Sequence, residues 1–96
     1  MSWFVYILKC SDNSFYVGHT ENIENRLITH NNGKGAKHTA MRRPVTLIYH
    51  EPADSRIAAM NREQQIKHWS RIKKEALING DYKVLKNASK CRAQHK

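Results

Sequence analysis

The chain has 96 residues, and its 17 Lys and Arg side chains outnumber its 8 Asp and Glu side chains, which gives a formal net charge of +9 with histidine neutral. A chain of this length predicts one domain and excludes a second, and it can close a small core without disulfide bonds. Its 19 Ile, Leu, Val and Phe residues are a share typical of the border with disordered proteins. Because these residues are clustered along the chain, we predict a folded domain.

The positive charge favours a polyanionic partner, and nucleic acid is the commonest one. The charge is uneven, since residues 1–52 carry 6 basic and 4 acidic side chains whereas residues 53–96 carry 11 and 4. We therefore expect the C-terminal half to supply part of the binding surface. Charge that serves solubility alone is the alternative.

Two features of the sequence indicate the cellular compartment of the protein. Cys10 and Cys91 are 81 positions apart, with no CxxC pair and no His-x-Cys cluster near them, which argues against a disulfide framework and a structural zinc site. The longest apolar run, residues 3–8, is far shorter than a signal-peptide core or a membrane span. We expect reduced thiols in a cytoplasmic protein that is neither exported nor bound to a membrane.

The first predicted unit is a β-hairpin. Residues 3–9 form an apolar, aromatic and β-branched run that is typical of a buried strand. Residues 10–14 (CSDNS) have turn chemistry, because Asp, Asn and Ser side chains bond to nearby backbone. Residues 15–17 return as a second strand, and Gly18 ends it.

A helix is predicted next, over residues 21–31, with Thr20 as its N-cap. The glycine-containing residues 32–35 end it. Residues 33–44 then form a basic loop without an acidic side chain, and residues 45–49 form the third strand.

Two helices are predicted to complete the fold. The first runs over about residues 55–68, with Asp54 or Ser55 as its N-cap, and the second begins at Ser70 and ends at residues 79–80. The expected class is α+β: a small three-stranded antiparallel sheet with flanking helices in the order β-β-α-β-α-α.

The domain is predicted to span residues 1–87. Tyr82, Val84 and Leu85 are expected to dock a last segment onto the core. Residues 88–96 lack periodicity and are predicted to be a disordered basic tail.

One constellation of residues points to chemistry. Tyr6 and Tyr16 lie on the two predicted hairpin strands, so antiparallel pairing can bring both phenols to one region of the sheet. Gly18 would let the backbone turn toward the predicted helix, where Arg26 and His30 share a face at a spacing of four residues. Each residue alone is typical of ordinary packing or of a solvated surface, whereas the combination is specific.

The triplets at residues 4–6 (FVY) and 16–18 (YVG), followed by Arg26 and His30, resemble the GIY-YIG nuclease family. Phe4 stands where the first glycine of the family name would be, so the first triplet matches only at its hydrophobic and tyrosine positions. The segments VYILKCSDNSFYVG, GKGAKHT, RRPV and EQQIKHWSRIKKEALI make the chain most similar to a group of small stand-alone bacterial proteins, the YhbQ-like group.

The resemblance implies a nuclease that hydrolyses phosphodiester bonds with a divalent metal ion, Mg²⁺ or Mn²⁺. It assigns catalytic roles to Tyr6, Tyr16, Gly18, Arg26 and His30, and a metal-binding role to Glu63. The alternative for Glu63 is a surface ion pair with Lys67, which follows it by four residues in the favourable orientation.

These residue types suit the implied chemistry. Arginine offers a fork of donors that matches phosphate oxygens, and Mg²⁺ often takes only one or two protein carboxylates, so Glu63 can suffice. A tyrosine is an unusual base because its usual pKa is about 10, but Arg26 and a metal-bound water would both assist it. Whether Tyr6 or Tyr16 takes the proton, or His30 relays it, stays open.

The expected nucleic-acid contacts are basic and histidine side chains of the second triplet, the loop and the later helices. They are His19, Lys34, Lys37, His38, Arg42, Arg43, Arg62, Lys67, Arg71, Lys73 and Lys74. Gly33 and Gly35 lack the spacing of a phosphate-binding P-loop and predict a mobile basic loop instead.

We therefore predict a DNA endonuclease, for which the resemblance suggests structure selectivity and a role in repair or recombination. DNA is favoured over RNA, although no residue decides between them, and a partner protein could supply targeting. Two alternatives stay open: a non-catalytic nucleic-acid-binding module on the same fold, and a protein-interaction domain.

Overall fold

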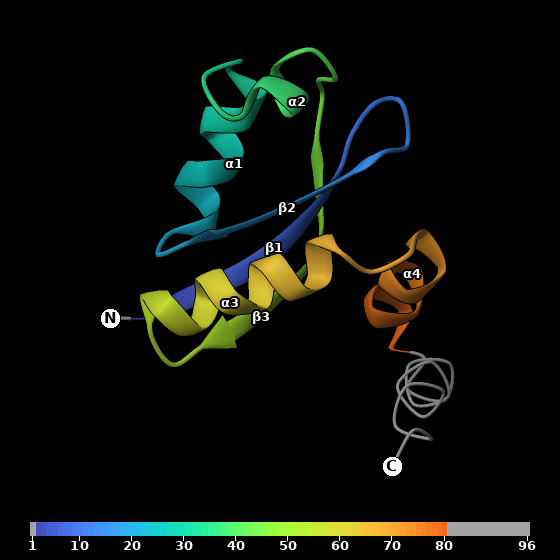
Figure 1. Cartoon of the computed structure of the whole chain (residues 1–96). Coiled ribbons are helices and arrows are strands. Elements are labelled where there is room, and N and C mark those ends of the chain that lie inside the picture. The colour runs from blue at the N-terminus through green and yellow to red at the C-terminus, as the bar shows by residue number, and fades with distance from the viewer. Residues whose placement is uncertain (1, 81–96) are drawn as a thin grey trace.

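The computed structural model describes residues 2–80, which form an α+β fold with a three-stranded antiparallel sheet and flanking helices, as predicted (Figure 1). The elements are β1 (Trp3–Lys9), β2 (Phe15–Thr20), α1 (Ile23–Asn31), α2 (Lys37–Ala40), β3 (Thr46–Ala53), α3 (Arg56–Lys67) and α4 (Arg71–Asn79). The predictions for Tyr82, Val84, Leu85 and the tail at 88–96 lie outside the described residues. Within residues 2–80, no helix is long and apolar enough to cross a membrane.

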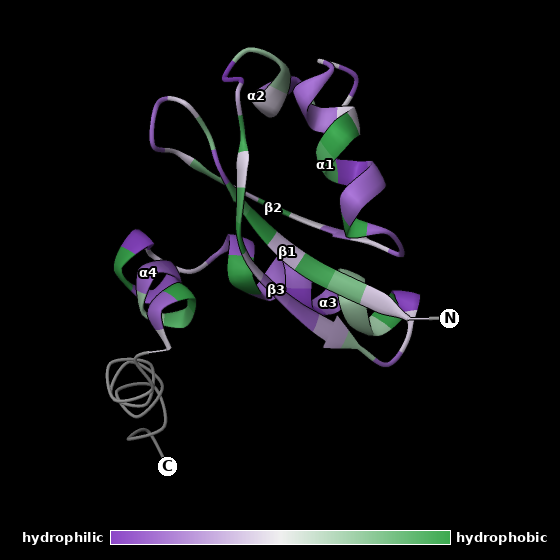
Figure 2. Ribbon diagram, turned by 180° about the vertical axis from the view of Figure 1, so that it is seen from behind, coloured by the Kyte–Doolittle hydropathy of each residue, from purple (hydrophilic) through white to green (hydrophobic). Residues whose placement is uncertain are grey.

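β1 is the central strand, with β2 on one side and β3 on the other, and both pairings are antiparallel. Successive side chains of a strand point to opposite faces. Val5 and Ile7 accordingly pack against Ile66 of α3 on one face. Tyr6 and Leu8 pack on the other face, against side chains of α1 and of the start of β3. Burial on both faces explains why the sequence of β1 is mostly apolar, and Figure 2 shows this strand largely in green along the middle of the molecule.

α1 begins later than predicted, because β2 is longer than predicted. Thr20 is the last residue of β2 and lies opposite Phe4 of β1, so it is not the N-cap. The side chain of Asn22 takes that place by accepting a hydrogen bond from the backbone N–H of Asn25.

The prediction of a plain loop over residues 33–44 is wrong, because the short helix α2 lies within it. The third strand also continues beyond Tyr49 to Ala53 and includes Pro52. Proline cannot donate to a strand ladder, and it is tolerated here because β3 is an edge strand. α2 therefore changes the predicted element order to β-β-α-α-β-α-α.

The two late helices confirm the predicted caps. The Ser55 hydroxyl accepts from the backbone N–H of Ala58 at the start of α3, and the Ser70 hydroxyl accepts from that of Lys73 at the start of α4. α4 ends at Gly80, whose φ of 70° is the left-handed conformation that favours glycine. Ile66 is fully buried in the core.

The sequence suggests that Gly18 ends β2 and turns the chain, and this prediction is wrong. Gly18 lies inside the strand, directly opposite Tyr6 of β1. A Cβ atom at Gly18 would overlap the Tyr6 hydroxyl and come within 2.6 Å of Tyr6 Cζ. Glycine is needed here because the ring of Tyr6 crosses the backbone of the neighbouring strand.

We expect Gly18→Ala to destabilise the fold by about 1–3 kcal/mol, the usual cost of overpacking a rigid core, as measured by urea unfolding. The matched control is the double variant Gly18→Ala with Tyr6→Ala, compared with Tyr6→Ala alone. Removing the ring should abolish the cost of the added methyl group. A cost of equal size in the Tyr6→Ala background would show that the clash is not with this ring.

Candidate active site

The candidate site forms around β2, the edge strand on one side of the sheet. Tyr6 and Tyr16 lie on the face of the sheet that packs toward α1. His19 is opposite Val5 and therefore lies on the face toward α3. Because β2 has no further strand beyond it, side chains from both faces and from α1 and α3 can approach one another around its edge.

The two tyrosines lie together, as the hairpin prediction implied, and His30 joins them in one cluster. The hydroxyl oxygen of Tyr6 lies 3.1 Å from Nε2 of His30 in a buried hydrogen bond. The ring centroids of Tyr16 and His30 are 5.1 Å apart, and those of Tyr6 and Tyr16 are 6.4 Å apart. Tyr6 and His30 are each 1% exposed, whereas Tyr16 is half-buried. The structure therefore brings together three of the four predicted catalytic side chains.

The environment sets the protonation of this cluster. Burial raises the pKa of Tyr6, Tyr16 adds to the rise, and the charge of Arg26 opposes it. Burial also raises the pKa of Tyr16, against the opposing charge of Lys67. Burial and the charge of Arg26 both lower the pKa of His30. At neutral pH the phenols are protonated and His30 is neutral, so His30 is a proton acceptor beside a proton donor.

Arg26 lies on α1, one turn before His30, and its side chain is exposed. Its charge acts on both Tyr6 and His30, so this exposed guanidinium lies near the cluster. A phosphate group that approached the cluster from solvent would meet this guanidinium, whose donors match phosphate oxygens.

Glu63 is held by two partners at the other side of β2. Glu63 is 8% exposed. Its Oε1 lies 2.5 Å from Nδ1 of His19, and its Oε2 lies 2.7 Å from Nζ of Lys67. Burial raises the pKa of Glu63, but the hydrogen bonds from Lys67 and His19 outweigh it, so the pKa lies below its usual value. The Glu63–Lys67 pair that the sequence offered as an alternative is thus present, although Glu63 is buried and not on the surface.

The carboxylate of Glu63 is a ligand type that fits a divalent metal ion. A carboxylate is the ligand type that Mg²⁺ prefers, and the Lys67 ammonium shows that a cation is accommodated at Oε2. The Lys67 side chain is 40% exposed and can swing into solvent. Among residues 2–80, no group of three or more His, Cys, Asp and Glu side chains converges. An ion held by Glu63 would therefore take most of its ligands from water and phosphate.

His38 and Arg42 hold the loop of α2 against the β1–β2 turn. The Ser14 hydroxyl donates to Oδ1 of Asp12 (2.6 Å), so Nε2–H of His38 donates to Ser14 Oγ (3.0 Å). Arg42 donates from Nε to Oδ2 of Asp12 (2.8 Å) and from a terminal nitrogen to the backbone oxygen of His38 (3.1 Å). The hydrogen bonds from Ser14, and then Arg42, lower the pKa of Asp12 to about 2.

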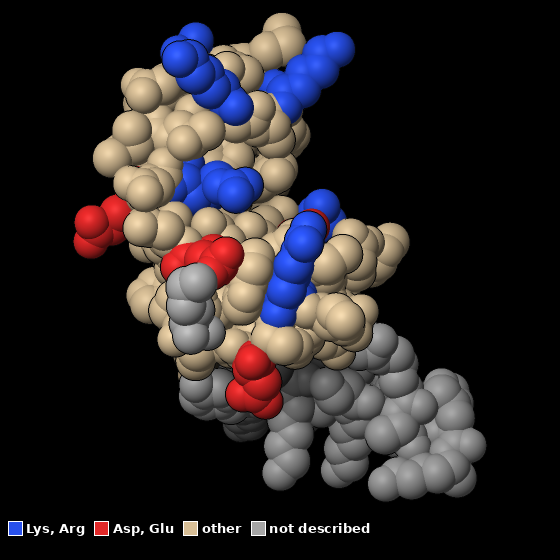
Figure 3. Space-filling model, turned by 90° about the vertical axis from the view of Figure 1, so that its left-hand side faces the viewer, with Lys and Arg blue, Asp and Glu red and all other residues tan. Residues whose placement is uncertain are grey.

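The other predicted contacts in this region divide into two kinds. Arg43 donates to the backbone oxygens of Ala40 and Asn31 and so fastens α2 to the end of α1. Lys34 and Lys37 are exposed. In Figure 3, basic side chains project from the top of the molecule, where α1 and α2 lie. This end therefore carries cations that are open to a polyanion.

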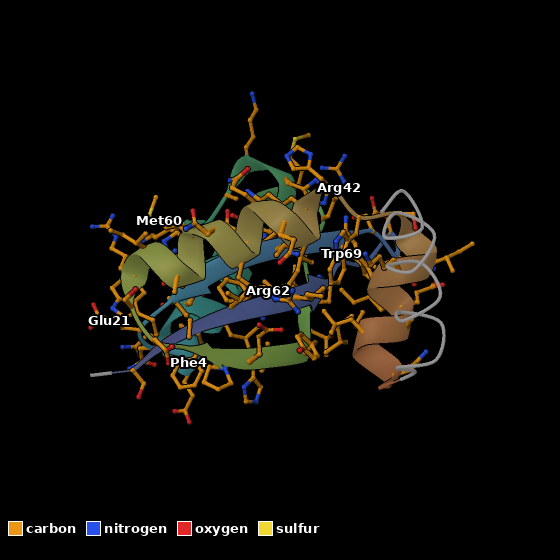
Figure 4. All side chains as sticks on the ribbon, turned by 60° about the horizontal axis from the view of Figure 1, so that its bottom comes forward. Phe4, Glu21, Arg42, Met60, Arg62 and Trp69 are labelled. Atoms are coloured by element: carbon orange, nitrogen blue, oxygen red, sulfur yellow. The ribbon has the colours of Figure 1, made fainter. Side chains whose placement is uncertain are left out.

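The basic side chains of α3 and α4 mostly have partners inside the molecule. Arg62 pairs with Glu51 (2.9 Å) and lies over the ring of Trp69 (5.1 Å), at the junction of α3 and α4 (Figure 4). Lys73 is buried, and its Nζ lies 4.3 Å from the centre of the same ring. Arg71 pairs with Glu75. Lys74 is partly buried, and burial lowers its pKa.

Lys73 is thus part of the packing of α4, Lys74 is half-buried, and Arg71 is exposed but paired with Glu75. Five of the 11 basic residues that the sequence counts over residues 53–96 lie outside the described residues: Lys83, Lys86, Lys90, Arg92 and Lys96. The excess of charge in the C-terminal half therefore does not form a patch on α4 itself.

Sequence reasoning missed two residues that contact His30. Thr39, which is 0% exposed, has its hydroxyl oxygen 2.7 Å from Nδ1 of His30. Gly35 approaches the same ring so closely that an added Cβ would collide with Nδ1 and lie 2.8 Å from Cε1. The glycine-containing segment is therefore packed on the site, and the prediction of a mobile loop is wrong at Gly35. Glycine three residues before a His-Thr pair was the available signal.

The Glu63 ion pairs predict a pH dependence of stability. Because the folded-state pKa of Glu63 lies below its usual value of 4.5, the carboxylate stabilises the fold above that pH, and this contribution is lost as the pH falls through the lowered value. The stability difference between wild type and Glu63→Gln should therefore shrink on acidification, as measured by urea midpoints from pH 7 to pH 3. Glu24→Gln, an exposed carboxylate of α1, is the control for loss of charge. A difference that does not change with pH would contradict the ion pairs.

Comparisons with known proteins bear on this arrangement. The chain matches the family model described as the GIY-YIG catalytic domain over residues 2–76. A UPF0213 protein of Staphylococcus haemolyticus is 55% identical over 75 residues, which are 78% of this chain and 92% of that protein. A UPF0213 protein of Bacillus pumilus is 49% identical over 75 residues, which are 78% of this chain and 76% of that protein.

Two solved structures share the fold. The solution NMR structure of a UPF0213 protein from Bacillus halodurans has a TM-score of 0.53 and 43% identity, covering 82% of this chain and 84% of that one. The solution NMR structure of a protein from E. faecalis has a TM-score of 0.58 and 37% identity, covering 85% and 88%. The chain therefore belongs to the GIY-YIG nuclease family, among its small bacterial UPF0213 (YhbQ-like) proteins.

Proposed function

We propose that the protein is a metal-dependent endonuclease that hydrolyses phosphodiester bonds in DNA. The observation that carries the proposal is the buried hydrogen bond between the Tyr6 hydroxyl and Nε2 of His30, next to the charge of Arg26. A neutral imidazole that accepts a hydrogen bond from a phenol can take the phenol's proton as the phenol takes one from an attacking water. Membership of a family that acts on nucleic acids supports the choice of substrate.

The chain's own residues account for the proton transfers. An attacking water would give a proton to the Tyr6 oxygen while the Tyr6 hydroxyl proton passes to Nε2 of His30, which leaves hydroxide and an imidazolium. Hydroxide forms a bond to phosphorus, the bond to the leaving sugar oxygen breaks, and that oxygen takes a proton from solvent. Tyr16, the more exposed phenol, would orient the water.

Two charged residues would act on the phosphate. Arg26 would bind the non-bridging oxygens and stabilise the charge that develops on them. Glu63, oriented by His19, would hold Mg²⁺ or Mn²⁺ once Lys67 has moved aside. When bound, the metal would polarise the phosphate and stabilise negative charge. Lys67 would then be free to contact the nucleic-acid backbone.

The substrate would approach the end of the molecule that carries α1 and α2. Lys34 and Lys37 are exposed there and would contact phosphates, which gives affinity without reading sequence. DNA with exposed or branched strands is the preferred substrate in this proposal, with a role in repair or recombination. A protein partner would supply further targeting.

A non-catalytic nucleic-acid-binding module is the second candidate. One observation favours it: both carboxylate oxygens of Glu63 already have partners, His19 and Lys67. If Lys67 held its place permanently, the fold would present a basic surface without a metal.

Glu63→Gln separates the two candidates. The substitution preserves size and helix propensity but removes the charge that would bind the metal. On labelled single-stranded, nicked and branched DNA, wild type should cleave with Mg²⁺ or Mn²⁺ and not with a chelator. The variant should keep its gel-shift affinity and lose cleavage. Binding by wild type without any metal-dependent cleavage would establish the module, and full cleavage by the variant would refute the role of Glu63.

Tyr6→Phe and Tyr16→Phe test the choice of base. Removing the Tyr6 hydroxyl should lower single-turnover cleavage by about 100- to 10,000-fold, the contribution of general base catalysis. Tyr16→Phe should have a smaller effect on the same rate, because it removes orientation and not the proton acceptor. A larger loss in Tyr16→Phe would transfer the role of base to that residue.

A further inference from the structure

We propose that Thr39 is a positioning residue that fixes the tautomer of His30, so that Nε2 is free to accept the proton of Tyr6. The catalytic effect of this role rests on the proposed function. The tautomer itself is a property of the folded protein and does not depend on that function. Thr39 lies on α2, outside both tyrosine triplets, and none of the sequence motifs assigns it a role.

The Thr39 hydroxyl has a single hydrogen to donate. That hydroxyl donates to the backbone oxygen of Ala36 at 2.9 Å. A threonine hydroxyl has a single donor and two acceptor lone pairs. The 2.7 Å contact between Thr39 Oγ1 and His30 Nδ1 must therefore be one in which Nδ1–H donates and the hydroxyl accepts.

The direction of this bond decides the other side of the ring. A neutral imidazole carries one N–H, so a hydrogen on Nδ1 leaves Nε2 with a lone pair. The 3.1 Å contact with Tyr6 is then one in which the Tyr6 hydroxyl donates and Nε2 accepts. The chain of donation runs from Tyr6 to His30, from His30 to Thr39 and from Thr39 to Ala36.

Burial makes this arrangement compulsory. His30 and Thr39 are 1% and 0% exposed, so water cannot replace a missing partner at either ring nitrogen or at the Thr39 hydroxyl. Leaving a buried donor or acceptor without a partner is costly, and each of these bonds therefore fixes the next.

The charges around the ring favour the neutral form. Tyr6 faces the ring from β1 and Tyr16 from β2, while Arg26 acts on it from α1. Arg26 and burial both lower the pKa of His30. The partner on α2 is the uncharged hydroxyl of Thr39, so Nδ1 is oriented without a carboxylate that would raise this pKa.

Gly35 leaves the space that the His30 ring needs. A Cβ at Gly35 would collide with Nδ1 of His30 and lie 2.8 Å from Cγ. The chain therefore passes directly beside the ring at Gly35 and then brings the Thr39 hydroxyl to Nδ1. The segment 35–39 encloses the side of His30 that faces away from Tyr6.

The test combines NMR with kinetics on full-length protein. The ¹⁵N and ¹³C shifts of the His30 imidazole in wild type should report the Nδ1–H tautomer. Thr39→Ser keeps the hydroxyl and should keep this tautomer. Thr39→Val is similar in shape but cannot accept, so it should lose the Nδ1–H signature. Single-turnover cleavage should fall about 100-fold in the Val variant, the lower end of what general acid–base catalysis contributes, with substrate affinity unchanged and near-wild-type rate in the Ser variant.

The outcomes separate this role from the proposed function. An Nε2–H tautomer in wild-type protein would overturn the role of Thr39 even if the Val variant failed to fold. A folded Val variant with the wild-type tautomer and rate would overturn it as well. Nδ1–H in wild type and Thr39→Ser, and its loss in Thr39→Val, would support the role even if no DNA were cleaved. The absence of cleavage would count against the nuclease proposal alone.

Discussion

The hydrogen bond between Tyr6 and His30 is the contact on which the candidate site depends. It joins the central strand to α1 across the edge strand β2, and neither residue is exposed by more than 1%. Because both groups are polar and buried, each requires the other as a partner. Gly18 makes the contact possible, since any side chain there would overlap the Tyr6 ring.

A second constraint is that many basic side chains have partners within the molecule. Many of the basic side chains in the described residues neutralise acids or stack on rings within the molecule, as Arg42 does with Asp12 and Arg62 with Glu51. Glu63 is similarly held by Lys67. The high net charge is therefore a poor guide to the proposed binding surface, the exposed lysines near α1 and α2.

The sequence predicts the strands and helices whose local chemistry is unambiguous. The continuous apolar run of β1 and the caps Ser55 and Ser70 are of this kind, because they depend on neighbours in the chain. α2 and the role of Gly18 could not be predicted, because both depend on contacts made across the fold. The same holds for the end of β3, where Pro52 is tolerated only because the strand is at an edge.

In the candidate site, too, the sequence predicts some residues, whereas those that depend on contacts across the fold could not be predicted. The motif resemblance supplied Tyr6, Tyr16 and His30, and the structure brings these three together. The partners that orient them were not predictable, since Thr39 lies in a segment with no helical periodicity and His19 reaches Glu63 from a strand 44 positions earlier. Composition also overstated α4, where Lys73 is buried in packing.

The pH–rate profile of single-turnover DNA cleavage tests the central claim, that neutral His30 accepts the proton of Tyr6. Burial and Arg26 lower the pKa of His30 below its usual value of 6.5, so the rate should be constant through neutral pH and fall only as the pH drops below that value. A rate that instead rises about tenfold per pH unit from pH 7 toward 10 would mean that the phenol or water must ionise without His30, and it would contradict the account.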